Sequence, residues 1–140
     1  MLRPKEEAKM AGTIRLSSWL VIAAAVVLIG TAAFHATGYR PISDAIQASN
    51  AKPFLVVAVK ALWLMFSAHL VILAAVVVLA NSVPGRRRVL LACALIPAFD
   101  TVLLARFVGA FIGTFSRAAA AVLLIAGALV RARPEGAGGT

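Results

Sequence analysis

The sequence predicts an all-α membrane protein whose four transmembrane helices form an antiparallel bundle. Apolar residues make up 62% of the chain and the mean hydropathy is +0.97, whereas soluble domains contain about 45–50% apolar residues. Four stretches are also long enough to cross a hydrocarbon core that needs about 20 residues. Nearly the whole chain is therefore needed to cross the bilayer, and we expect a single transmembrane domain over residues 1–140.

Turn residues and charges separate the four predicted helices. Their expected ranges are 16–38, 54–80, 89–106 and 111–130. The last helix is placed from residue 111 because a start beyond Arg117 would leave it too short to span the core. Between the first two helices, Ser43 is a candidate cap for a short helix with Ile42 and Ile46 resting on the membrane surface.

The formal charge is +9, and the basic residues are distributed as in a multi-pass protein of a bacterial inner membrane. Nine of the fourteen basic residues fall on the N-terminal segment, the connection between the second and third helices, and the C-terminus. The positive-inside rule then places both termini in the cytoplasm, where we expect residues 1–15 and 131–140 to be flexible. Nucleic-acid binding would need a basic folded face with stacking aromatics, so we expect contacts with anionic lipid and none with nucleic acid.

The first apolar stretch admits a second interpretation. A basic segment precedes the apolar run from Trp19 to Ile29, and Thr31-Ala32-Ala33 resembles a signal-peptide cleavage site. The apolar run is longer than that of a typical signal peptide, which favours a retained helix. Cleavage would leave three helices and a mature N-terminus on the outer side of the membrane.

Three ionisable residues fall at similar predicted depths in the membrane. Counting from the helix ends at about 1.5 Å per residue places Asp100 about 12 Å, Arg117 about 9 Å and His69 about 12 Å below the outer face. An unpaired charge at such depth costs at least about 2.5 kcal/mol, so these residues usually pair or face a cavity.

We expect Asp100 and Arg117 to form an ion pair, because a short loop makes their helices antiparallel neighbours. Snorkelling of the Arg117 side chain to the outer headgroups is the alternative. His69 is either an interhelical hydrogen-bond partner or a proton-accepting site beside Asp100. Together His69, Asp100 and Arg117 form a predicted polar layer.

A second group of residues lies at the predicted outer boundary. His35, Tyr39, Trp63 and Arg106 are either ordinary interfacial residues or the mouth of an outward-facing pocket. The two histidines and Asp100 lie on three helices without the spacing of a metal site, and the single Cys93 excludes a dithiol pair. We therefore expect no metal and no cofactor.

The whole-chain pattern of helix count, helix length and charge placement resembles that of small uncharacterised bacterial four-helix inner-membrane proteins, including those grouped loosely with DoxX-like proteins. This resemblance implies architecture and location, and it transfers no active site. The chain does not resemble the small multidrug transporters, whose first helix carries a glutamate, because the stretch from Leu16 to Tyr39 has no acidic residue.

Three functional hypotheses follow. The first is an accessory or structural membrane component without enzymatic activity, whose partners are the lipid bilayer and either another membrane protein or further copies of the chain. The second is a small transporter or proton-coupled carrier that uses His69 and Asp100. The third is an enzyme that acts on a lipid or quinone at the outer leaflet, with His69 as the base.

Overall fold

The computed structural model describes residues 4–130, and of residues 4–11, 13 and 14 it describes the backbone alone. Its elements are five α-helices: α1 (Pro4–Thr37), α2 (Tyr39–Ala48), α3 (Pro53–Ala80), α4 (Arg86–Phe107) and α5 (Ile112–Leu129). Four helical spans are long and apolar enough to cross a membrane, and α1 joins α2 in the first of them, from Arg15 to Ala48. The predicted all-α fold with four transmembrane helices is confirmed.

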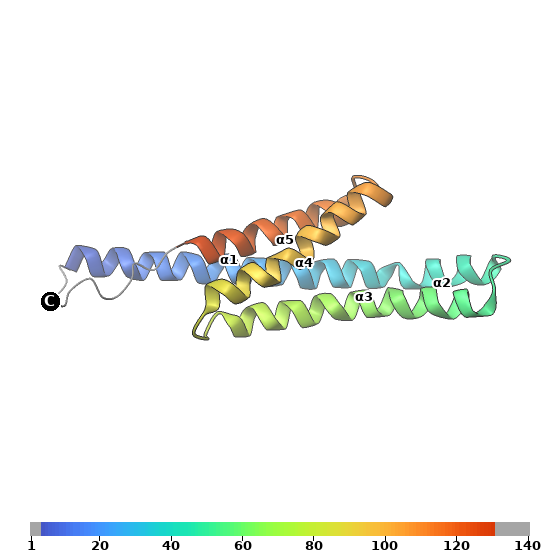
Figure 1. Cartoon of the computed structure of the whole chain (residues 1–140), viewed down its shortest axis with the longest axis horizontal. Coiled ribbons are helices and arrows are strands. Elements are labelled where there is room, and N and C mark those ends of the chain that lie inside the picture. Colours follow the sequence, from blue (N-terminus) through green and yellow to red (C-terminus); the bar gives the residue numbers. More distant parts are fainter. Residues whose placement is uncertain (1–3, 131–140) are drawn as a thin grey trace.

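The helices form an antiparallel bundle in which α1 takes the central place. It packs against both α3 and α5, while α4 packs chiefly against α5 and touches α3 much less (Figure 1). We call the end of the bundle that holds the α3–α4 turn the inner end, and the end that holds the α4–α5 turn the outer end.

The first helix is longer than predicted. It begins at Pro4 instead of residue 16, so the described part of the N-terminal segment that was expected to be flexible is helical. Residues 4–15 are rich in alanine, glutamate, lysine and methionine, which favour helix, and proline is well tolerated in a first turn. The predicted flexible C-terminal segment, residues 131–140, lies outside the described residues.

The connection after the first span also differs from the prediction. Ser43 does not cap a separate helix, because α2 begins at Tyr39, runs on from α1 and packs beside the start of α3 (Figure 1). Gly38, between the two helices, keeps a helical backbone, and the Ile42 N–H donates to its carbonyl at 3.1 Å. The helical path is therefore nearly continuous, and Ile42 and Ile46 are half-buried.

The buried apolar core occupies the inner part of the bundle. Close packing of α1 on α5 depends on Gly127, where an added Cβ would lie 3.1 Å from the Val21 Cγ2. Small residues of this kind let membrane helices approach closely. The largest fully buried apolar side chains of the core are Val21, Leu28, Leu70, Val77, Leu90 and Leu124.

The outer part of the bundle is built differently. There the α4–α5 hairpin diverges from α1 and α3, and α2 and the start of α3 extend beyond its turn (Figure 1). The turn contains Gly109 at φ 100°, a left-handed conformation that glycine adopts without steric cost. The Thr114 hydroxyl donates to the Gly109 carbonyl at 2.8 Å and ties the turn to α5. This divergence separates two helix pairs at the outer end, α1 with α3 and α4 with α5.

Candidate binding site at the outer end of the bundle

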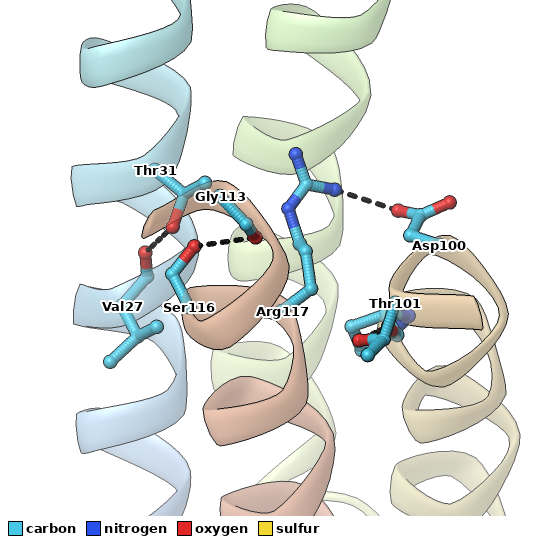
Figure 2. A network of polar contacts seen from close by, with 8 residues as sticks. Val27, Thr31, Asp100, Thr101, Gly113, Ser116 and Arg117 are labelled. Carbon is cyan, nitrogen blue, oxygen red and sulfur yellow. Dashed lines mark hydrogen bonds and ion pairs between the residues drawn. The ribbon is translucent and has the colours of Figure 1, made fainter. Parts of the chain in front are cut away.

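A buried ion pair joins α4 to α5. The Arg117 Nη1 donates to the Asp100 Oδ2 at 2.7 Å, and the two side chains are only 2% and 14% exposed. Helical side chains lean toward the N-terminus of their helix, so the Arg117 side chain reaches outward along α5 to the level of Asp100 (Figure 2). The structure thus pairs the two residues as the sequence predicted.

The guanidinium of Arg117 also contacts α3. Its central carbon lies 4.4 Å from the centroid of the Phe66 ring, a cation–π geometry that is worth more when the cation is shielded from water. The Nε atom is buried without a hydrogen-bond partner in the described part of the chain. Arg117 therefore links three helices while its hydrogen-bonding capacity is only partly used.

His69 does not join this pair. Its ring lies 5.9 Å from the centroid of the Phe66 ring, and the hydrogen bonds of Asp100 and Arg117 within residues 4–130 do not include it. The reason is the arrangement of the helices, because α4 packs mainly on α5 and little on α3. Similar depth therefore does not give His69 a hydrogen bond to Asp100, and of the three residues of the predicted layer Asp100 and Arg117 are the two that pair.

His35 has a more specific environment than an interfacial residue. Its Nδ1 lies 2.9 Å from the Ser67 hydroxyl oxygen, and its ring stacks on Trp63 at 4.1 Å between centroids. The Trp63 indole N–H donates to the His35 carbonyl at 2.8 Å. Gly38 leaves the space for this indole, because an added Cβ would lie 2.7 Å from the Trp63 Cζ2.

These side chains border a cavity of about 380 Å³ between the diverging helix pairs. Phe34 and His35 line it from α1, Trp63 and Phe66 from α3, and Arg117 from α5. The rings of His35 and Phe66 lie 4.9 Å apart, so an unbroken series of contacts runs from Trp63 through His35 and Phe66 to Arg117. We call this space the outer cavity.

The predicted outer mouth is only partly reproduced. His35 and Trp63 line the outer cavity, whereas Tyr39 and Arg106 are not among its lining residues. Arg106 is exposed, and its guanidinium lies 5.6 Å from the centroid of the Phe107 ring. Among the described residues, no three His, Cys, Asp or Glu side chains are placed to hold a metal ion.

Sequence reasoning missed two features. Phe66 lies three residues from both Trp63 and His69, and this helical spacing was the available signal that it shares their face. At the inner end, the Ser17 hydroxyl donates to the Gly127 carbonyl at 2.8 Å, and the Arg86 Nη2 donates to both the Ser17 hydroxyl oxygen and that carbonyl. Arg86 therefore ties α4 to α1 and α5 in addition to lying at a predicted headgroup region.

Comparison with known proteins gives no match: no family model, curated protein or solved structure is similar to the chain. The resemblance to DoxX-like proteins stays a prediction. Any functional conclusion therefore rests on the site itself.

Removing one partner of the ion pair should destabilise the protein. In Asp100→Asn, the Arg117 charge stays buried without its counter-charge, which costs at least about 2.5 kcal/mol at this depth. We expect a much lower yield of monodisperse protein in size-exclusion chromatography in mild detergent. Adding Arg117→Met removes the orphaned charge and should restore the yield.

Asp44→Asn is the matched control, because Asp44 is exposed on α2 and its neutralisation should leave the yield unchanged. A wild-type yield for Asp100→Asn, or no recovery in the double variant, would show that the pair does not stabilise the bundle.

Proposed function

We propose that the chain is an accessory or structural component of a bacterial inner membrane. The observation that carries this proposal is the Asp100–Arg117 pair, buried between α4 and α5. Asp100 is the sole acidic residue within helices α3 to α5, and it is engaged in holding two helices together. Its position supports a role in fixing the bundle as a scaffold.

The outer faces of the helices support the second half of the proposal, which is contact with other membrane components. Once the charged pair is buried, large apolar side chains make up most of the surface of α3 and α4. Such a surface suits lipid and suits packing against a membrane-protein partner or further copies of the chain. Examples of residues that are at least half exposed are Val57, Leu62, Met65, Ile72, Leu79, Leu95, Phe99 and Val102.

We further propose that the inner end of the bundle faces the cytoplasm, which places both termini there. The support comes from the charge distribution, because Arg86, Arg87 and Arg88 follow the inner α3–α4 turn while fewer basic residues lie at the outer end. Cytoplasmic connections of inner-membrane proteins carry such an excess of lysine and arginine. The outer cavity would then open on the periplasmic side.

Transport is a second candidate function, and the outer cavity favours it. A carrier needs a binding space within the membrane with a titratable group in it, and His35 lines this cavity. His35 therefore replaces His69 as the candidate proton-accepting residue of this hypothesis.

Purification from native membranes tests the accessory role. Tagged protein extracted in mild detergent should bring one partner protein in a fixed ratio, as quantified by mass spectrometry. Asp100→Asn should lose that partner and the additional Arg117→Met substitution should regain it, because the scaffold depends on the pair. Recovery of the chain as an isolated monomer, or as a monomer with only a retained lipid or small molecule, would contradict the accessory role and favour the second candidate.

Reporter fusions test the orientation. A fluorescent protein that folds only in the cytoplasm should be bright when fused after Thr140, and alkaline phosphatase should be active when inserted after Asn50, beyond the end of α2. The opposite pattern would reverse the proposed orientation. Fusion of each reporter at the other site serves as the matched control.

Proton flux tests the second candidate. In this reading, vesicles that contain the protein and a trapped pH-sensitive dye take up protons under an imposed gradient, and His35→Phe abolishes the uptake while leaving a ring to stack on Trp63. Arg106→Gln, at an exposed position outside the cavity, should keep it. Uptake by the wild-type protein no faster than in protein-free vesicles would exclude proton-coupled transport under these conditions.

A further inference from the structure

We propose that the outer cavity binds a neutral, largely apolar molecule whose polar end carries a carbonyl oxygen. Its basis is the cavity together with the buried, partly unpartnered guanidinium that lines it. The inference does not depend on the accessory role, because a scaffold protein and a carrier could both hold such a ligand.

The size and walls of the cavity suit a small amphipathic molecule. Its volume of about 380 Å³ lies within the range of about 300–1,000 Å³ typical of ligand sites, which are mostly apolar with a few placed polar groups. Phe34, Trp63, Phe66 and Phe111 contribute aromatic rings to the walls. Aromatic side chains offer a large apolar contact area in defined geometries, so flat or acyl groups would both find partners.

Two glycines allow these walls to form before any ligand arrives. At Gly113 an added Cβ would lie 2.5 Å from the Phe111 Cε2, and at Gly38 it would lie 2.7 Å from the Trp63 Cζ2. Both distances are shorter than side-chain atoms tolerate, so the two rings occupy space that any other residue would fill. The cavity is thus lined on the sides of both helix pairs by rings packed against glycine.

The polar end of the ligand has a defined partner in Arg117. Its Nη1 is engaged by Asp100, whereas its Nη2 has no hydrogen-bond partner within the described residues and points away from Asp100 (Figure 2). Across the cavity, His35 uses Nδ1 for Ser67, and Nε2 has no partner in residues 4–130. Two nitrogen groups from opposite helix pairs therefore have hydrogen-bonding capacity to spare.

The chemistry of these groups selects the ligand. A guanidinium only donates hydrogen bonds, so the ligand must present an acceptor. Asp100 already balances the Arg117 charge, and an anionic ligand would bring an uncompensated negative charge into a poorly solvated site. A neutral carbonyl oxygen meets both requirements. Such a carbonyl is available from two sources, a ketone next to a flat ring or the acyl ester of a membrane lipid.

Native mass spectrometry of the purified protein in detergent tests this inference with three probes. Dodecanophenone carries a carbonyl next to a flat ring, dioctanoylglycerol carries acyl esters, and dodecylbenzene has the apolar body without a carbonyl. We expect one saturable molecule of a carbonyl probe per chain, bound at least about tenfold more tightly than dodecylbenzene, as for a hydrogen bond to a charged group. Tighter binding of the ketone identifies a carbonyl next to a flat ring as the preferred source, and tighter binding of the glyceride identifies a lipid ester.

Cavity-filling variants keep the ion pair intact and locate the bound probe. Val108 and Leu104 line the cavity, so Val108→Phe and Leu104→Phe should each weaken binding of the carbonyl probe about tenfold or more. Val102→Phe and Leu103→Phe change neighbouring exposed positions outside the cavity and should not. Equal binding of dodecylbenzene, non-saturable uptake of all probes, or equal loss in cavity and control variants would overturn the proposal.

Discussion

A guanidinium held inside a membrane-spanning helix is the constraint on which the outer half of this protein depends. Arg117 is too deeply buried to be solvated by water, so its charge has to be met by groups from neighbouring helices. Asp100 on α4 supplies the counter-charge, and the Phe66 ring on α3 covers its face. One side chain of α5 thereby sets how two other helices are placed around it.

The two ends of the bundle are held together by different contacts. At the inner end, apolar side chains interlock, and Arg86, Ser17 and the Gly127 carbonyl connect three helices through hydrogen bonds. At the outer end the α4–α5 hairpin leans away, so aromatic rings and the ion pair take the place of an interlocked apolar core (Figure 1). The close-packed inner half therefore holds together the helices that diverge around the outer cavity.

The sequence predicts well those features that depend on local composition. Long apolar runs require membrane-spanning helices because backbone polar groups have no other partners in lipid, and the four spans follow from this. The Asp100–Arg117 pair can also be predicted from the sequence, because a short turn fixes the relative depth of residues on adjacent helices. The start of α1 at Pro4 is not predicted by hydropathy, because charged residues lower the hydropathy of a segment without ending the helix.

The remaining features depend on which helix faces which, and depth alone does not contain that information. Equal depth groups His69 with Asp100, but α3 and α4 have little contact, and the two residues form no hydrogen bond. The position of His35 in the sequence predicts a boundary residue, yet the continuation of α1 into α2 and the small Gly38 allow its ring to stack on Trp63. The outer cavity forms because the α4–α5 hairpin leans away from α1 and α3. No single stretch of sequence specifies that angle.

The unequal lengths of the helices have a consequence for the surrounding bilayer. The 28 residues of α3 extend about 42 Å, whereas the 18 residues of α5 extend about 27 Å. A hydrocarbon core of about 30 Å is therefore exceeded on one flank of the protein and nearly matched on the other. The helices that face the lipid are therefore unequal in length, which favours tilting of the bundle and local changes in bilayer thickness. Hydrophobic mismatch of this kind sorts proteins among membranes of different thickness and promotes contacts between helices.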